Sequence, residues 1–246
     1  AAPGGGWDGL GRAIEQAAKT FERLSIDLIY ALPGQTVDGW QAALREAVAL
    51  GFEHVSPYQL TIEPTTAFGR AFERGTLVPP NEDVAADLYE ATQVALEGVG
   101  FETYEVSNHA RGEAARSAHN VHVWRGGDYV GVGPGAHGRL TEEGVRVATV
   151  AHRRIADYVE GVASGSPWSE LQRMEAREAA EERLLLGLRT IEGVALALLS
   201  ALDLDPAVAP VTDLVEDGFV AIADGRLAAT AKGRPVLDAV LKTLLT

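Results

Sequence analysis

The sequence contains no cysteine, and this absence excludes several kinds of chemistry. Without a thiol the chain can form no disulfide, no thiolate zinc site and no cysteine-ligated iron–sulfur cluster. Long apolar runs are missing too, since no stretch reaches the length needed to cross a membrane. The first residues, AAPGGGWDG, have neither a basic flank nor an apolar core, so they predict no signal peptide.

The sequence also has fewer basic than acidic side chains. Lys and Arg number 21 against 35 Asp and Glu, which gives a formal net charge of -14. Such a surface repels phosphate backbones, so a nucleic-acid partner is disfavoured. Hydrophobic residues make up 46% of the 246 residues and charged residues 23%, which is enough apolar material for a folded core. We therefore expect a globular, cytoplasmic protein.

The first half of the sequence alternates predicted helices and strands. Thr36 and Asn81 are suited to cap the starts of two helices, the first over 37–50. A further helix is predicted over 8–19, and strands over 24–30, 55–62, 101–106 and 129–133. Strands separated by helices of this length predict parallel βα units.

The pattern changes after Gly138. A hairpin is predicted between 138–140 and 145–150, followed by helices at 152–163, 175–187, 193–201 and 207–217. A second hairpin around Asp224-Gly225 and a final helix after Thr230 complete a winged-helix-like pattern. Because the chain is acidic, we interpret this module as a lid or partner surface rather than a DNA reader. The predicted domains are 1–150 and 151–246.

Asp27 stands in the segment SIDLIYALPGQT, which predicts a buried strand that breaks sharply at Pro33-Gly34. An ionised carboxylate in an apolar strand is costly unless something pairs with it. Near the end of a strand that leads into a helix, such a carboxylate indicates a ligand site at a barrel mouth or sheet edge. A simple cap on the following turn is the structural alternative.

The next predicted strand alternates apolar and polar side chains, with Tyr58, Leu60 and Ile62 against Gln59, Thr61 and Glu63. One face of this strand could therefore hydrogen-bond a ligand, although a half-buried edge strand fits the pattern equally well. Further along the chain, Glu105 and Asn108 of YEVSN could orient a polar ligand, or Asn108 could form an Asx turn.

Two histidines and a tryptophan lie close together in the segment HNVHVW. His119 and His122, three residues apart beside Trp124, could face a heme, since histidine is a common axial ligand and an indole can pack on the macrocycle. A surface position without a ligand is the alternative for this histidine pair.

The glycine-rich run GVGPGAHG, residues 131–138, is not a dinucleotide fingerprint. Its spacing is wrong for one, and Pro134 removes a backbone N–H. Its glycines suit close approach of the backbone to a ligand or a neighbouring strand.

These motifs, in this order, resemble HemW-type heme chaperones, radical S-adenosylmethionine (SAM) proteins related to oxygen-independent coproporphyrinogen III oxidase. The resemblance runs from about Leu10 to the C-terminus and comprises LGR, SIDLIYALPGQT, YQLTIEP, YEVSN, HN…W, GDYVGVGPGAHGRL and LLLGLRT. It implies an α/β fold, with the C-terminal half of a partial (β/α) radical-SAM barrel followed by a mostly helical, winged-helix-like domain of the HemN C-terminal type.

The resemblance also implies ligand-contacting residues. The positions implied for SAM are Arg12, Asp27, Tyr58, Leu60, Thr61 and His137, with Asp27 at the ribose hydroxyls. The positions implied for heme are His119, Asn120 and Trp124, although Val123 stands where relatives usually have tyrosine. No catalytic residue is assigned. The family holds a 4Fe–4S cluster on a CxxxCxxC loop, which this cysteine-free chain lacks, so no metal ligand is assigned to it.

The lack of an initiator Met and of the cluster loop leads us to expect a portion of a longer protein that lacks its N-terminal cluster-binding segment. By resemblance, SAM and a 4Fe–4S cluster serve the intact protein, heme is the cargo and hemoproteins are the acceptors. Alone, the chain is not expected to cleave SAM reductively. One alternative is a coproporphyrinogen III oxidase that decarboxylates propionate side chains, for which basic residues would be needed. Another is a fragment with no ligand. The oligomeric state stays open.

Overall fold

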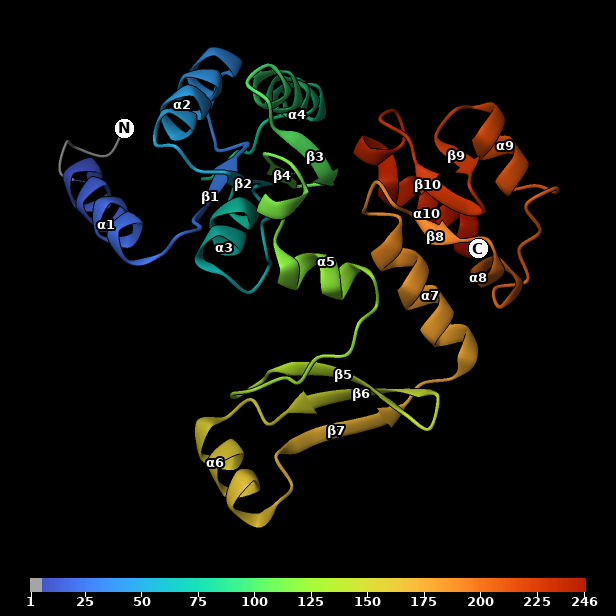
Figure 1. The fold of residues 1–246 in the computed structure, drawn as a ribbon. Helices are drawn as coiled ribbons and strands as arrows, with labels where there is room; N and C mark the ends of the chain where they lie inside the picture. Colours follow the sequence, from blue (N-terminus) through green and yellow to red (C-terminus); the bar gives the residue numbers. More distant parts are fainter. Residues whose placement is uncertain (1–5) are drawn as a thin grey trace. The chain divides into compact units, whose positions relative to one another are not determined.

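The computed structural model describes residues 6–246, with side chains from residue 11 onward (Figure 1). The chain forms two compact units, here called the N-terminal unit, up to Ser117, and the C-terminal unit, from Ala118. The predicted domain boundary at 150 falls inside a strand, β6, which pairs on both sides within the C-terminal unit. No helix among residues 6–246 is long and apolar enough to span a membrane.

The N-terminal unit alternates helices with short strands, much as predicted. Thr36 caps α2 by accepting a 3.2 Å hydrogen bond from Gly39 N, and Asn81 caps α4 through a 2.9 Å bond from Val84 N. The elements are α1 (Gly6–Thr20), β1 (Ser25–Tyr30), α2 (Val37–Ala49), β2 (His54–Gln59), α3 (Ala67–Glu73), α4 (Glu82–Glu97), β3 (Glu102–Glu105), β4 (Asn108–Ala110) and the short 3₁₀ helix η1 (Glu113–Ala115).

These strands form one sheet in the order β1-β2-β4-β3. The predicted parallel pairing holds between β1 and β2, where Asp27 is in register with Ser56. It is wrong for the remaining pairs, because β4 is antiparallel to both β2 and β3. The chain reverses after Glu105 and inserts β4, so β3 runs in the same direction as β1 and β2 but is not paired with either of them in the sheet.

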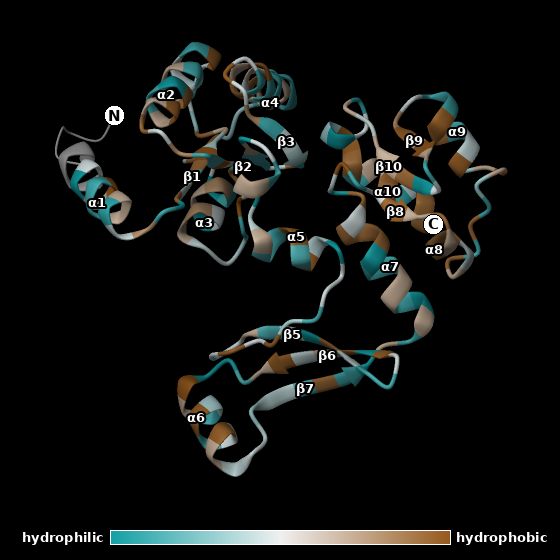
Figure 2. Cartoon of the chain, viewed as in Figure 1, coloured by the Kyte–Doolittle hydropathy of each residue, from teal (hydrophilic) through white to brown (hydrophobic). Residues whose placement is uncertain are grey.

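The core of the N-terminal unit lies between this sheet and the helices α2 and α4. Trp40 stacks on Tyr30 with ring centroids 5.4 Å apart, and its Nε1 donates to Thr92 Oγ1 at 2.7 Å. Leu44 and Leu88 are fully buried in the same cluster. Figure 2 shows hydrophobic and hydrophilic residues interspersed along α2 and α4, as expected of helices with one buried face.

The C-terminal unit contains two antiparallel sheets, β5-β6-β7 and β8-β10-β9. Both predicted hairpins, β5–β6 and β9–β10, are confirmed. The elements are α5 (Ala118–Trp124), β5 (His137–Glu142), β6 (Val145–Ala151), α6 (Ile155–Ser164), β7 (Trp168–Arg173), α7 (Ala176–Gly187), β8 (Val194–Ala195), α8 (Ala197–Ser200), α9 (Val211–Glu216), β9 (Val220–Ala223), β10 (Arg226–Ala229), the 3₁₀ helix η2 (Arg234–Val236) and α10 (Leu237–Leu245).

The elements from α7 to β10 follow the order helix, strand, two helices and hairpin. The strand β8 pairs with β10, as the first strand of a winged helix does with its wing. The predicted helix over 193–201 therefore starts late, at Ala197, because Val194 and Ala195 form β8, and the predicted helix over 207–217 is shortened to α9. The winged-helix-like pattern itself is confirmed.

The predicted strand over 129–133 is wrong. Of the five residues 129–133, only Tyr129 forms a β-bridge, a single antiparallel pairing with Arg139. A Cβ at Gly131 would lie 2.4 Å from the carbonyl oxygen of His137, and one at Gly138 would lie 2.9 Å from Gly131 N. The glycines thus allow two backbone segments to cross closely. This close approach accounts for the glycine-rich composition of the run, and neither a strand nor a ligand is needed to explain it.

Candidate functional site

One face of the sheet in the N-terminal unit is polar. Ser25 and Asp27 of β1 are in register with His54 and Ser56 of β2, and neighbours in register point to the same side of a sheet. A 2.6 Å hydrogen bond between Ser25 Oγ and His54 Nδ1 joins the two strands on this side. The alternate residues of β1, such as Ile26 and Leu28, pack against the core beneath α2 and α4. The polar face is therefore the side away from those helices.

A chain of hydrogen bonds braces one end of the polar face. His54 Nε2 lies 2.7 Å from Tyr104 Oη, which also accepts a 3.2 Å bond from Ser117 N. Burial lowers the pKa of His54, an effect that the negative charge of Asp27 partly opposes. Burial likewise raises the pKa of Tyr104 to about 12. At neutral pH these groups are an uncharged imidazole and a protonated phenol, suited to positioning rather than to proton transfer.

A second hydrogen-bonded group fastens β4 into the sheet. Ser56 Oγ donates to Asn108 Oδ1 at 2.9 Å, and Asn108 Nδ2 donates to the fully buried Glu105. The same oxygen, Glu105 Oε1, accepts 2.7 Å bonds from both N and Oγ of Ser107. The YEVSN motif thus holds the reversal between β3 and β4. Asn108 bridges strands here instead of forming the Asx turn that the sequence also allowed.

The open part of the polar face lies toward the carboxyl ends of β1 and β2. Asp27 is exposed, and beyond it Ile29 and Tyr58, which are in register, are 55% and 39% exposed. The expectation of a costly carboxylate inside a buried strand is therefore corrected. The strand β1 is buried on one face only, and Asp27 points to the other, where water can solvate its charge.

The other residues implied for SAM are distributed more widely. Strand β2 ends at Gln59, so half-buried Leu60 and exposed Thr61 follow it, with Leu60 N still bonded to Tyr30 O at 2.9 Å. Arg12 is exposed on α1, and His137 is exposed on β5 in the C-terminal unit. The structure thus brings Asp27 and Tyr58 onto one sheet face, whereas Arg12 and His137 lie on other elements.

The residues implied for heme lie on α5 but not on one face of it. His119 and Trp124 are five positions apart, which separates them by about 140° around a helix. His119 is exposed, whereas half-buried Trp124 packs under the Arg189 guanidinium, 4.8 Å from its ring centroid. Asn120 is half-buried. His122 Nε2 lies 2.7 Å from the carbonyl oxygen of Asp128, so this second imidazole is engaged by its own loop.

The sequence analysis missed His54, Ser56 and Tyr104. A signal for His54 and Ser56 was present in the sequence. These residues and Tyr58 occupy alternate positions of one strand and so lie on one face, but the alternation was recognised only from Tyr58 onward. Tyr104 offered no comparable signal, since its link to His54 spans 50 positions of the chain.

Comparison with known proteins identifies the fold. Residues 174–236 match the HemN C-terminal domain. The fold matches the solved structure described as "Coproporphyrinogen III oxidase (HemN) from Escherichia coli is a Radical SAM enzyme", with a TM-score of 0.74 over 97% of this chain and 58% of that one, at 18% identity. This chain therefore has the fold of that solved structure over the part that it covers.

The sequence comparison is more specific. The Mycobacterium tuberculosis heme chaperone HemW is 37% identical over 235 residues, and the mouse mitochondrial radical S-adenosyl methionine domain-containing protein 1 is 34% identical over 247. Each alignment covers 95% of this chain, but only 58% and 56% of the respective relative. The chain is similar in sequence to the HemW-type heme chaperones and spans little more than half the length of these relatives.

Proposed function

We propose that this chain provides the SAM-facing sheet and the heme-handling portion of a HemW-type heme chaperone, which binds heme and transfers it to hemoproteins. The observation that carries the proposal is the polar sheet face, where exposed Asp27 lies beside a network braced by His54 and Glu105. The similarity to HemW proteins along almost the whole chain supports it.

The residues of the polar face fit the nucleoside part of SAM. The Asp27 carboxylate is a suitable acceptor for two ribose hydroxyls, and the ring of Tyr58 offers a flat apolar surface to an adenine. The chain does not fit a 4Fe–4S cluster, because it has no cysteine, and no group of three potential metal ligands occurs among the described residues. The proposed role is therefore one of binding, and no redox step is assigned to this chain.

Replacing Asp27 with asparagine is expected to weaken SAM binding by about tenfold to a hundredfold, because hydrogen bonds to a charged acceptor contribute about 1.5–3 kcal/mol. Isothermal titration of the chain with SAM measures this change. Asp87→Asn is the matched control, since Asp87 is an exposed carboxylate on α4, at the opposite face of the sheet. Equal SAM affinity in both variants would exclude Asp27 from the site.

Heme titration tests the chaperone role. Adding heme to the purified chain is expected to give a saturable change in Soret absorbance, and His119→Ala is expected to alter the bound spectrum, because the exposed imidazole of His119 is the proposed axial ligand. His122→Ala is the matched control on the same helix, since its ring is already bonded to the Asp128 carbonyl. A folded chain without saturable heme binding, or a His119→Ala spectrum identical to the wild type, would contradict this assignment.

The charges around the polar face favour the chaperone over the oxidase. A substrate with several propionate groups would call for several cations at its site. The charged side chains near the His54–Tyr104 network include two cations and two anions: Arg23 and Arg116 against Asp27 and Glu105. The Arg23 guanidinium already donates to the carbonyl of Arg116. An assay for propionate decarboxylation by the protein supplied with a reductant and SAM distinguishes the two functions.

A further inference from the structure

The C-terminal unit contains a pocket of about 340 Å³. Its lining residues come from α7, α8, the β5–β6 hairpin and the turn after α5. Apolar residues form most of its lining, with Ala176, Ala179 and Ala180 on one face of α7 and Leu198 on α8. Because Ala176 and neighbouring Ala201 are exposed, the pocket is open to solvent.

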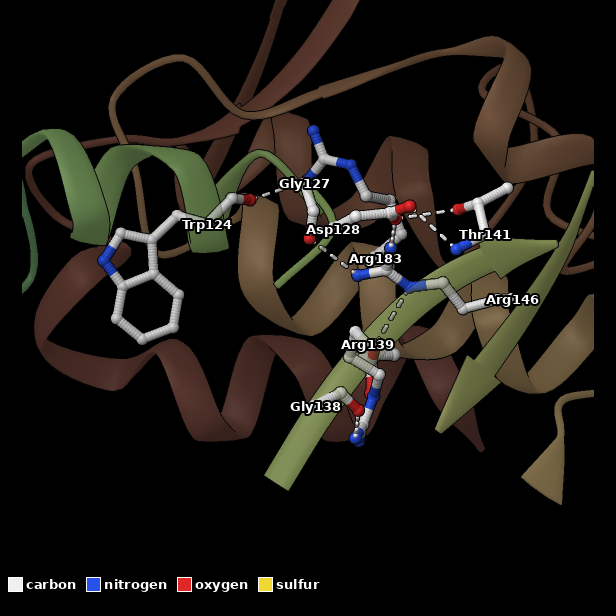
Figure 3. Close-up of polar contacts among 9 residues, drawn as sticks. Trp124, Gly127, Asp128, Gly138, Arg139, Thr141, Arg146 and Arg183 are labelled. Atoms are coloured by element: carbon white, nitrogen blue, oxygen red, sulfur yellow. Dashed lines mark hydrogen bonds and ion pairs between the residues drawn. The ribbon is translucent and has the colours of Figure 1, made fainter. Parts of the chain in front are cut away.

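Three charged side chains line this pocket, and two of them are neutralised. Glu182 Oε2 accepts bonds of 2.8 and 2.7 Å from Nε and Nη2 of Arg139. The guanidinium of Arg146 donates to the Asp128 carboxylate at 2.6 Å, which in turn accepts two bonds from Thr141 (Figure 3). These contacts leave Arg183 as the remaining charge of the lining.

Arg183 has no carboxylate within ion-pair distance among residues 11–246. Its Nη1 donates to the carbonyl oxygen of Trp124 at 2.9 Å, a neutral acceptor (Figure 3). Burial lowers the pKa of Arg183, and the nearby positive charges of Arg226 and Arg146 lower it further, whereas Glu192 opposes this. An arginine nevertheless keeps its charge at neutral pH. The pocket therefore holds a positive charge without a matching anion, in a chain of net charge -14.

Two glycines leave room for the Arg183 side chain, and its bond to Trp124 O fixes the guanidinium. A Cβ at Gly126 would lie 2.8 Å from Arg183 Cδ, and a Cβ at Gly187 would lie 2.6 Å from Arg183 Nη1. Both positions thus leave space that the arginine fills. A guanidinium fixed in this way loses little conformational entropy when it pairs with an anion.

We infer that this pocket binds a small organic carboxylate with a short apolar body, its carboxylate on Arg183 and its apolar part against Ala179 and Leu198. The planar guanidinium matches a carboxylate. The alanine and leucine lining suits a hydrocarbon chain and offers few of the donors that a phosphate would need. The inference is independent of the function proposed above.

Butanoate is the probe for this site, and ¹³C-methyl NMR of the full chain is the measurement. We expect saturable shifts at the methyl groups of Ala179 and Leu198. Arg183→Gln should weaken binding at least about tenfold, because a charged hydrogen bond is lost. Arg177→Gln is the matched control on the same helix, since Arg177 pairs with Glu181 and Asp203 outside the pocket, and it should keep the wild-type affinity.

A second variant keeps the test decisive if Arg183→Gln does not fold. Ala179→Leu fills the pocket and leaves Arg183 bonded to Trp124, so it should abolish the butanoate shifts in a folded protein. No saturable shift in the wild type, unchanged affinity in Arg183→Gln or Ala179→Leu, or tighter binding of inorganic phosphate than of butanoate would overturn the inference.

Discussion

Replacing Glu105 with alanine is expected to lower the free energy of unfolding of the N-terminal unit by about 3–5 kcal/mol. Glu105 is fully buried, and one of its oxygens accepts hydrogen bonds from Ser107 N, Ser107 Oγ and Asn108 Nδ2. Alanine would leave buried Asn108 and half-buried Ser107 without their acceptor, and each buried unpaired group costs about 1–3 kcal/mol. Asn108 would also lose the partner that orients it toward Ser56.

Urea unfolding measures the free energy of unfolding. Hydrogen exchange of the β2 and β4 amides, measured separately, assigns the loss to this unit. Glu102→Ala is the matched control on the same strand, because the Glu102 side chain is 65% exposed and its oxygen lies 3.9 Å from Arg116. An exposed pair of this kind contributes less than about 1 kcal/mol. Similar losses in the two variants would show that the buried network does not stabilise the sheet.

Trp40→Ala should be about as destabilising, by about 3–5 kcal/mol, because it removes the largest side chain from the core between the sheet and α2. Trp40 is 2% exposed and stacks on Tyr30. Trp40→Phe separates packing from hydrogen bonding. It keeps most of the ring volume, and Thr92 Oγ1 still donates to Leu88 O at 2.7 Å, so we expect a loss of only about 1–2 kcal/mol.

Circular dichroism during urea unfolding gives both values for Trp40. The decisive comparison is between the two losses of unfolding free energy, which we expect to be smaller for Trp40→Phe. Both variants remove the bond to Thr92, so they differ mainly in the cavity they leave. If phenylalanine were as damaging as alanine, the bond to Thr92, rather than the packing, would hold this part of the core together.

Local signals in the sequence predicted the elements that rest on local interactions. Thr36 and Asn81 mark the starts of α2 and α4 because their side chains bond the first turns of those helices. Strand β4 could not be predicted in this way. Its three residues follow β3 after a two-residue reversal, and what keeps them in the sheet is the contact of Asn108 with Ser56, 52 positions away.

The candidate site was predicted in part. Asp27 was recognised by its charge within an apolar strand, although the side of the strand it faces depends on which side α2 and α4 cover. The linkage of Ser25 to Tyr104 through His54 was not visible, because it joins three strands that only the fold brings together. Arg183 was likewise missed, since its value as a binding group depends on having no paired carboxylate among its neighbours in space.

The position of β1 in its sheet has a practical consequence for handling the purified protein. Within residues 6–246, β1 pairs only with β2, so the backbone N–H and C=O groups of its other edge have no partner strand in the sheet. Exposed edges of this kind promote self-association, and a charge on the strand counters it. Asp27 is the only charged residue in β1, so neutralising it also removes a barrier to aggregation. Variants at this position are best compared at low protein concentration, with their particle size monitored alongside binding.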